Sequence, residues 1–440
     1  MKTKILNIAV LLLCLGLGAQ KFQGVANTPP MGWNSWNTFE VNINEELVKQ
    51  TADIIVSSGM KDAGYEYIVL DDGWMVKDHR DENGNLIPDP VKFPSGMKAL
   101  IDYVHAKGLK FGLYNCAGTN TCAGYPGTRG YEYQDARFYA SLGIDFLKYD
   151  WCFTEGINAK EAYTTMSKAL KTAGKPIVFS ICEWGDNQPW NWATPVGNLW
   201  RISGDIYPCF DCEYKHEEGN WSSWGVLKIL EMRKDIRKFS GPDHWNDFDM
   251  MEVGNGMTLA EDKSHFTLWS MMASPLFAGN DLRSMKPETL KILTNKEMIA
   301  INQDVLGIQG FKYQSENGVD VWVKPLADDN WAVVFLNRTE KSQKIKFDWK
   351  KHVIEDLDFK FTLNLTQQTY TLRDLWEHKD LGKTNKIFEK EKFQPNDPAY
   401  GWDGSYRNKK VNSAVFVYWA LIKFKDGESF LYKGDVTVQR

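Results

Sequence analysis

The chain has 440 residues, of which 43% are hydrophobic and 13% aromatic, and its formal net charge is −5. This length exceeds that of one ordinary domain, so we expect one large domain with a sizeable core and a smaller second one. The mild net negative charge gives no indication of a nucleic-acid partner, which a strongly basic surface would suggest. The 18 Trp, 18 Tyr and 23 Phe residues favour a cleft that binds sugar rings, although tryptophan also packs well in cores.

The first 19 residues have the pattern of a secretion signal peptide. Two lysines within residues 1–4 precede an apolar stretch, residues 5–18, that is short for a membrane span, and we expect cleavage near Ala19. A lipoprotein attached through Cys14 is the alternative, but leucines occupy the three positions before this cysteine. Since no later stretch is long and apolar enough to span a bilayer, the sequence predicts an exported protein, periplasmic or secreted.

Apolar runs of strand length alternate with helical patterns from residue 27 to residue 303. The expected strands are residues 31–36, 67–74, 109–115, 144–150, 177–184, 199–205, 244–250 and 274–280. The expected helices are residues 42–63, 96–107, 132–142, 155–173, 222–239, 259–272 and 287–302. Asn42 and Glu45 have capping-box spacing, Ser95 is an expected N-cap, and Gly108 is an expected C-cap. This alternation predicts a (β/α)8 TIM barrel, an α/β fold.

The pattern changes at about residue 304. Residues 310–325, 330–337 and 344–349 alternate apolar and polar side chains, with turn residues between them. We therefore expect a C-terminal antiparallel β-sandwich domain over residues 304–440, in which residues 386–440 are weakly specified. The apolar residues 413–424 are either a closing strand or part of an appended hairpin.

Charged side chains gather at the C-terminal ends of five expected strands. They are Asp71 and Asp72, Lys148 and Asp150, Glu183, Arg201 and Asp205, and Asp247 and Asp249. In a barrel, these ends meet at one mouth, where active sites are built. A surface ion pair would explain any single case, but the recurrence favours an active site.

Two kinds of chemistry use several carboxylates at one mouth. Glycoside hydrolysis needs a pair that flanks the scissile bond, whereas enolase-type chemistry needs several acids to hold Mg²⁺ and a Lys or His base. The surplus of acids, together with Lys148 and Arg201, suits charge-assisted hydrogen bonds to a polyhydroxylated ring, which favours hydrolysis. Tryptophans accompany the strand ends, and for Trp74 and Trp151 we expect packing rather than contact with a sugar.

Six cysteines follow the signal segment: Cys116, Cys122, Cys152, Cys182, Cys209 and Cys212. Export permits disulfides, but six cysteines allow about 15 connectivities, so the residues alone leave the pairing open. Cys209 and Cys212 have CxxC spacing. Because no second Cys/His pair accompanies them, a local disulfide or free thiols are favoured over a zinc or redox site.

Seven segments carry a resemblance to a known family. They are TPPMGWNSW (28–36), LDDGW (70–74), CAGYPG (122–127), LKYDWC (147–152), CEWG (182–185), NDFDMMEVGNG (246–256) and RDLWEHKDLG (373–382). In this order they resemble the α-galactosidases, or melibiases, of glycoside hydrolase family 27. The resemblance implies a barrel over residues 27–303, an antiparallel β domain after it, and no metal or organic cofactor.

The resemblance also implies roles for individual residues. Asp150 is similar to the nucleophile, and Asp205 to the acid/base, of a retaining, exo-acting double displacement. Lys148 would keep Asp150 ionised, and carboxylates near Asp205 would help it to hold its proton. The implied substrate-binding residues are Trp33, Asp71, Asp72, Tyr114, Cys122, Lys148, Glu183, Trp184, Arg201 and Met250. Cys122 and Cys152 resemble a disulfide of the family that lies beside the nucleophile.

The implied substrates are α-galactosides, either oligosaccharides or polysaccharide side chains. Glu183 stands where α-N-acetylgalactosaminidases have a small residue, and the intact pair Asp71 and Asp72 distinguishes the chain from β-L-arabinopyranosidases. Both activities are kept as alternatives, as is a galactose-binding barrel without activity. The state of assembly, including a homodimer, stays open.

Several residues keep a structural alternative. Asp72 could cap a loop instead of binding sugar, and Asp247 and Asp249 could be hydrogen-bonding residues beneath the pocket. Two departures from the family pattern are also present. Phe248 stands where family members usually have proline, and the chain after Gly382 lacks the expected closing strand.

Overall fold

The computed structural model describes residues 21–390 except residues 218, 220, 234 and 340–342, together with the backbone of residues 405–406, 409–410 and 414–418. The expected signal peptide, residues 1–19, lies outside the described residues. Among the helices of the described part, none is long and apolar enough to cross a membrane.

Eight parallel strands form the barrel that the sequence predicts. They are β1 (Met31–Asn34), β2 (Tyr67–Val69), β3 (Lys110–Cys116), β4 (Phe146–Asp150), β5 (Val178–Cys182), β6 (Leu199–Arg201), β9 (Trp245–Asp247) and β10 (Leu276–Ala278). Neighbours follow chain order from β1 to β9, and β10 pairs with β1. The ring closes where Met251, beyond β9, forms a parallel bridge with Ala278 of β10. The predicted (β/α)8 barrel is therefore confirmed.

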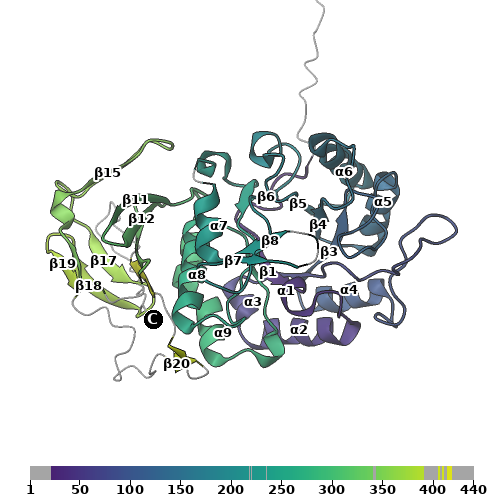
Figure 1. Cartoon of the computed structure of the whole chain (residues 1–440), viewed down its shortest axis with the longest axis horizontal. Helices are drawn as coiled ribbons and strands as arrows, with labels where there is room; N and C mark the ends of the chain where they lie inside the picture. Colours follow the sequence, from purple (N-terminus) through teal and green to yellow (C-terminus); the bar gives the residue numbers. More distant parts are fainter. Residues whose placement is uncertain are drawn as a thin grey trace, which may run out of the picture.

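Helices surround the ring of strands, as Figure 1 shows. They are α1 (Trp36–Phe39), α2 (Glu45–Ser57), α3 (Met60–Ala63), α4 (Met97–Ala106), α5 (Glu132–Leu142), α6 (Ala159–Ala173), α7 (Val226–Met232), α8 (Leu259–Met271), α9 (Pro287–Leu293) and α10 (Lys296–Asn302). Helix α5 has the bounds that the sequence predicts. Apolar side chains on one stripe of a helix such as α2 (Leu47, Val48, Ile55) are buried against the strands.

The predictions for three of the helices are wrong in detail. The expected helix 42–63 is two helices, because Gly59 adopts a left-handed φ of 86° between them. The side chain of Asn44, not Asn42, caps α2 by accepting from the Leu47 amide at 2.9 Å. Gly96 rather than Ser95 precedes α4. The expected helix 287–302 is also divided, because Asn295 caps a new helix, α10, with its side chain.

The expected helix 222–239 is not continuous: only Val226–Met232 (α7) is α-helical, and Arg237–Phe239 forms a short 3-10 helix. Its first residues form β8 (Ser222–Trp224), which pairs antiparallel with β7 (Glu213–Lys215) in a hairpin. Helix α7 begins only after Gly225, which packs so closely on Cys209 that a Cβ there would lie 2.7 Å from the Cys209 carbonyl oxygen. The serines of β8 are weak helix formers, and strand pairing therefore decides their conformation.

The C-terminal domain is antiparallel, as expected. Strands β11 (Phe311–Glu316), β12 (Val319–Pro325), β13 (Trp331–Asn337) and β22 (Ala414–Tyr418) form one sheet. Three antiparallel pairs accompany it: β14 (Ile345–Phe347) with β19 (Phe388–Lys390), β15 (Val353–Asp356) with β16 (Phe361–Asn364), and β17 (Thr371–Asp374) with β18 (Lys379–Lys383). Within residues 413–424, β22 adds a fourth strand next to β13, so the expectation that no closing strand follows Gly382 is wrong.

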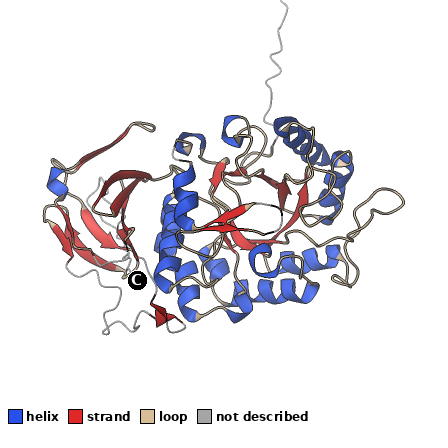
Figure 2. Ribbon diagram, in the orientation of Figure 1, coloured by secondary structure: helices blue, strands red, loops and turns tan. Residues whose placement is uncertain are grey.

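Helix α8 lies between the barrel and the C-terminal strands in Figure 2. The indole Nε1 of Trp376 donates to Thr267 Oγ1 on this helix at 3.3 Å. Arg237, after α7, forms an ion pair with Asp356 at 2.6 Å and also donates to the Gln309 carbonyl. These buried polar contacts fix the orientation of the second domain on the barrel.

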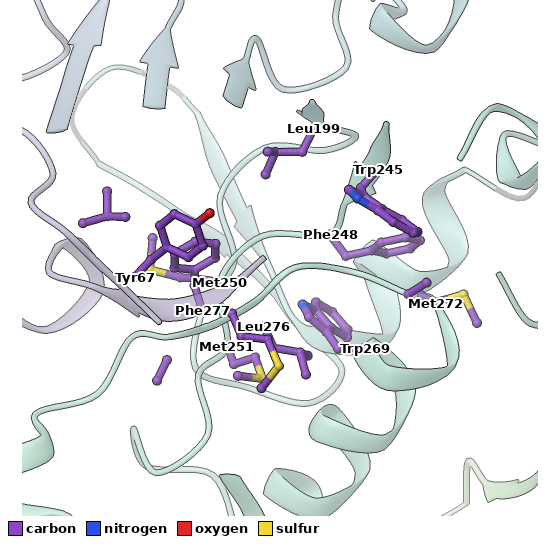
Figure 3. Close-up of a cluster of buried hydrophobic side chains, with 14 of the residues drawn as sticks. Tyr67, Leu199, Trp245, Phe248, Met250, Met251, Trp269, Met272, Leu276 and Phe277 are labelled. Carbon is purple, nitrogen blue, oxygen red and sulfur yellow. The ribbon is translucent and has the colours of Figure 1, made fainter. Parts of the chain in front are cut away.

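Large apolar side chains pack beneath the mouth of the barrel, as Figure 3 shows for Trp245, Phe248 and Trp269. Phe248 is 3% exposed and makes an edge-to-face contact with Trp269 at 5.8 Å between ring centroids. Its amide donates to Ser274 Oγ at 3.1 Å, a bond that proline would lack. Phe248, the departure from the family pattern between Asp247 and Asp249, therefore places an apolar ring in the core.

Candidate active site

A cavity of about 620 Å³ opens at the C-terminal ends of the barrel strands. Most of the predicted site residues line it: Asp71, Tyr114, Cys122, Lys148, Asp150, Cys152, Trp184, Arg201, Asp205 and Met250. They come from β3, β4 and β6, from the loops that follow these three strands, and from the loops that follow β2, β5 and β9. The barrel thus brings together charges that are far apart in the sequence, as the convergence of parallel strand ends predicts.

Asp150 is the last residue of β4 and is 6% exposed. The Tyr114 hydroxyl donates to its Oδ2 at 2.9 Å, and the Trp151 amide donates to its Oδ1 at 2.9 Å. Burial raises the pKa of Asp150 to about 6; the charge of Lys148 opposes this rise, and the charge of Asp205 adds to it. At neutral pH the carboxylate is therefore mostly ionised and is held in place by two donors.

Lys148 does not contact Asp150 directly. Its Nζ lies 2.8 Å from Asp71 Oδ2, which also accepts from Asn34 Nδ2 at 2.9 Å. Burial lowers the pKa of Lys148 more than any single neighbour raises it, but Asp71, Cys182 and Asp150 together raise it above its ordinary value. The lysine is therefore charged and influences Asp150 through space, while its hydrogen bond serves Asp71.

Arg201, at the end of β6, joins two carboxylates. Its Nη2 lies 2.7 Å from Asp249 Oδ2 and 3.1 Å from Asp205 Oδ1. The Asp205 side chain is 38% exposed, whereas that of Arg201 is only 3% exposed. A guanidinium therefore faces Asp205, a partner that the sequence analysis did not predict. Burial raises the pKa of Asp249, which accepts from the Ile206 amide and so fixes the chain just after Asp205.

Three predicted site residues do not line the cavity: Trp33, Asp72 and Glu183 are 0%, 1% and 0% exposed. Asp72 Oδ2 accepts from the Ala123 amide at 2.9 Å, so it holds the loop that contains Cys122, as the structural alternative for this residue predicts. Glu183 Oε2 accepts from the amide and the side chain of Asn187, and burial raises the Glu183 pKa to about 7. Trp33 packs in the core and donates to the Asn280 carbonyl.

Asp247 and Asp249 lie where the sequence analysis leaves a choice. Asp247 lines only a small cavity of about 30 Å³ inside the barrel, and its Oδ1 accepts from the Asp249 amide at 2.9 Å. Asp249 lines both this cavity and the large one. Both residues therefore support the floor, and Asp249 also reaches the site through Arg201.

Other residues on the wall were missed by the sequence analysis. They are Trp36, Asn37, Ala123, Asp186, Gly204, Trp221, Ser222 and Trp224. The β7–β8 hairpin supplies Trp221, Ser222 and Trp224, and its last strand, Ser222–Trp224, was expected to begin a helix. The pair of tryptophans three residues apart in an otherwise polar stretch was the available signal, because neither fits an apolar core pattern.

Two disulfides lie next to the site. Cys122 and Cys152 are bonded, as the resemblance implies, with Cα atoms 5.2 Å apart. Cys209 and Cys212 are also bonded, so the CxxC segment is a local disulfide. Cys116 and Cys182 are free and buried. Within the described part of the chain, no group of three or more His, Cys, Asp or Glu residues is arranged to hold a metal ion.

Comparison with known proteins agrees with this architecture. The family described as α-galactosidase A matches residues 28–304, and the α-galactosidase C-terminal β-sandwich domain matches residues 316–397. The chain is 54% identical over 394 residues to α-galactosidase A of Cellvibrio japonicus, covering 90% of this chain and 95% of that protein.

Solved structures give the same relationship. The chain superimposes on α-galactosidase I of Mortierella vinacea with a TM-score of 0.76 and 35% identity, over 84% of this chain and 95% of that one. A β-L-arabinopyranosidase of family 27 from Geobacillus stearothermophilus gives a TM-score of 0.69 and 26% identity, over 83% and 94% of the two chains. The chain therefore belongs to the α-galactosidase family 27 and is a glycoside hydrolase.

Proposed function

We propose that the protein is a retaining, exo-acting α-galactosidase in which Asp150 is the nucleophile and Asp205 the acid/base. The observation that carries this proposal is that both carboxylates line one cavity with different surroundings. Asp150 is buried between two hydrogen-bond donors, whereas Asp205 is more exposed and lies against Arg201. Two carboxyl groups in unlike surroundings are what a double displacement requires.

In the first step, an oxygen of Asp150 attacks the anomeric carbon of the galactosyl ring, and the bond from this carbon to the leaving oxygen breaks. Asp205 donates its proton to that oxygen, so the aglycone leaves as a neutral alcohol. Tyr114 and the Trp151 amide hold the Asp150 carboxylate in one orientation before attack, which reduces the reorganisation needed.

In the second step, Asp205 accepts a proton from a water molecule, whose oxygen attacks the anomeric carbon and displaces Asp150. Two inversions give overall retention of the α configuration. Arg201 suits this second role of Asp205, because a guanidinium stabilises the ionised carboxylate that the first step leaves behind. Its second partner, Asp249, holds the guanidinium in place through the cycle.

The galactosyl ring is expected to meet the charges on the cavity floor. Asp71 and Lys148, paired at 2.8 Å, offer an acceptor and a donor for neighbouring hydroxyls. Trp184, Met250 and Cys122 supply apolar surface beside them. For Trp33, Asp72 and Glu183 the proposed part is indirect, because the structure keeps them behind the wall.

Galactosides are favoured over the two alternative substrates. Identity to α-galactosidase A of Cellvibrio japonicus is 54%, against 26% for the β-L-arabinopyranosidase structure. At position 183 the chain has Glu, where the family resemblance implies a small residue in α-N-acetylgalactosaminidases. Oligosaccharides or polysaccharide side chains that end in α-galactose are the proposed substrates, and the proposed domain limits are residues 27–303 and 304–440.

Export from the cytoplasm, to the periplasm or the medium, is part of the proposal. The disulfides Cys122–Cys152 and Cys209–Cys212 are consistent with an oxidising compartment.

The first experiment compares p-nitrophenyl α-D-galactopyranoside with the α-N-acetylgalactosaminide and the β-L-arabinopyranoside. We expect the galactoside to have the highest kcat/KM and the first-formed sugar to be the α anomer by NMR. Asp150→Gly should abolish turnover and recover it with azide as β-galactosyl azide, while Asp205→Ala with azide should give α-galactosyl azide. Opposite anomers are expected because azide attacks opposite faces in the two variants.

A matched control is Asp186→Asn, an acid on the cavity wall with no proposed role in the chemistry. It should keep turnover within about tenfold of the parent. Preference for the arabinoside would refute the choice of galactose but keep the mechanism. A folded protein that binds galactose and cleaves none of the three substrates would support the inactive-barrel alternative.

A further inference from the structure

The β7–β8 hairpin is attached directly to the segment of the proposed acid/base. The Trp224 amide donates to the Asp205 carbonyl at 3.0 Å, and the Tyr207 amide donates to the Trp224 carbonyl at 2.9 Å. Gly204 permits this contact, since a Cβ there would lie 2.2 Å from the Trp224 ring. Figure 1 shows the hairpin over the ring of barrel strands. The Cys209–Cys212 disulfide closes the turn that leads into it.

A continuous stack of rings runs along this hairpin. Tyr207 and Tyr214 are stacked at 4.2 Å with an interplanar angle of 4°. Tyr214 meets the edge of His216 at 4.9 Å, and His216 stacks on Trp221 at 3.6 Å and 7°. His216 Nε2 is 2.8 Å from Ser223 Oγ, which fixes the plane of the imidazole. The Trp221 indole is therefore held in one orientation from behind.

The stack ends at the cavity. Trp221 lines the cavity wall and is nevertheless 45% exposed, the most exposed tryptophan among the described side chains. An indole that is covered on one side by an imidazole and left open toward a cavity has apolar surface available to a ligand. A purely structural tryptophan would be expected to bury this surface, as Trp200, Trp245 and Trp269 do.

The position of Trp221 relates it to one part of the substrate. The paired charges Asp71 and Lys148 and the nucleophile Asp150 form the floor, where the galactosyl ring would lie under the proposed function. Asp205 must reach the oxygen that joins this ring to the leaving group. The hairpin follows Asp205 along the chain and is bonded to its carbonyl, so it lies on the leaving-group side.

We propose that Trp221, supported by His216, is a platform for a hexopyranose leaving group. The axial C–H groups of a pyranose form an apolar face that packs against an aromatic ring, whereas a small alkyl group covers little of it. Trp221 is thus a specificity residue that favours galactosides with a sugar aglycone. This inference rests on the proposed function and adds to it the residue that contacts the sugar of the leaving group.

The test compares melibiose with methyl α-D-galactopyranoside. Both release an alcohol as the leaving group, but only the leaving group of melibiose is a second sugar ring. Trp221→Ala should lower the ratio of their kcat/KM values, melibiose over methyl galactoside, by about threefold to tenfold. Trp221→Phe, which keeps an aromatic face, should recover most of the ratio. His216→Ala should lower it by a smaller factor and act mainly through the KM for melibiose.

Tyr133→Ala is the matched control, since this residue is 43% exposed and lies on α5 outside the cavity. In Tyr133→Ala, the ratio of kcat/KM for melibiose to kcat/KM for methyl α-D-galactopyranoside should equal that of the parent. Equal losses for both substrates in Trp221→Ala, or no change in either, would overturn the inference and leave the proposed function intact. A parent enzyme that cleaves neither galactoside would instead refute the proposed function.

Discussion

The hydrogen bond from Tyr114 to Asp150 offers a sharp test of how the nucleophile is kept ionised. Tyr114→Phe removes one hydroxyl, the donor that lies 2.9 Å from Asp150 Oδ2, and leaves the ring that fills the wall. The Tyr114 pKa is raised by burial, so in the parent protein the hydroxyl stays protonated and donates at every pH of interest. Its loss should disfavour the ionised form of Asp150.

The size of the effect follows from the energy of the bond. A hydrogen bond to a charged group contributes about 1.5–3 kcal/mol, and about 1.4 kcal/mol corresponds to one pKa unit. Because the Trp151 amide remains and water can partly replace the hydroxyl, we expect a rise of about one unit, from about 6 to about 7. The ionised fraction at pH 6 then falls about fivefold, whereas at pH 8 it changes little.

The assay is the pH profile of kcat/KM for p-nitrophenyl α-D-galactopyranoside. The acid limb of this profile reports the pKa of the group that must be ionised in the free enzyme. In the parent, activity should fall below about pH 6, and in Tyr114→Phe the limb should move upward by about one unit. Tyr65→Phe is the control, because the buried Tyr65 hydroxyl has no hydrogen-bond partner among the described residues. An acid limb that stays in place in Tyr114→Phe would refute the reasoning.

The same raised pKa has a consequence for stability. The pKa of Asp150 is about 6 in the folded protein, above its value of about 3.9 in the unfolded chain. The contribution of Asp150 to stability is therefore fully present below about pH 3.9 and is lost as the pH rises through about 6. Asp150→Asn should therefore be more stable to heat than the parent at pH 7, with the difference disappearing near pH 4. A variant that is less stable than the parent at pH 7 would contradict the assignment of burial as the main cause.

Three further predictions concern stability and cofactors. The double variant Cys122→Ser, Cys152→Ser opens a loop of sequence separation 30, and chain entropy predicts that the free energy of unfolding falls by about 3–4 kcal/mol. Its melting temperature should be lower than that of the control Cys116→Ser, which removes a free thiol. Arg237→Met leaves the buried Asp356 without its partner and should cost about 3–5 kcal/mol, with KM unchanged because the contact lies between the domains; an altered KM would contradict this. Activity should survive prolonged treatment with EDTA, since a double displacement between two carboxylates needs no metal ion; a loss reversed by Mg²⁺ would favour the enolase-type alternative.

Much of the site was predictable because it depends on strand ends. A run such as residues 144–150 is apolar until it reaches Lys148 and Asp150, and parallel strands of a barrel deliver such ends to one mouth. The order of strands and the antiparallel second domain also follow from periodicity and turn residues. Helix boundaries were less predictable, because Gly59 and Asn295 interrupt patterns that remain helical on both sides.

Other features were beyond the reach of sequence patterns. Residues 222–224 have little strand character of their own and become β8 through pairing with residues 213–215 and with the Asp205 carbonyl. The guanidinium of Arg201 is shared between Asp205 and Asp249. The sequence shows only that these three residues lie near the C-terminal ends of expected strands. Long-range hydrogen bonds decide both cases, and no local pattern encodes them.

By itself, then, the sequence determined the barrel, the antiparallel domain and the set of acids at the mouth, because periodicity and strand polarity are local properties. Only the tertiary structure decided which of those acids face the cavity. Asp72 is turned to the Ala123 amide and Glu183 to Asn187, since a buried carboxylate must find donors, while Asp150 remains on the wall. The tertiary structure likewise placed Trp224 at Asp205, and Trp221 of the same hairpin on the cavity wall, because the hairpin satisfies its backbone hydrogen bonds there.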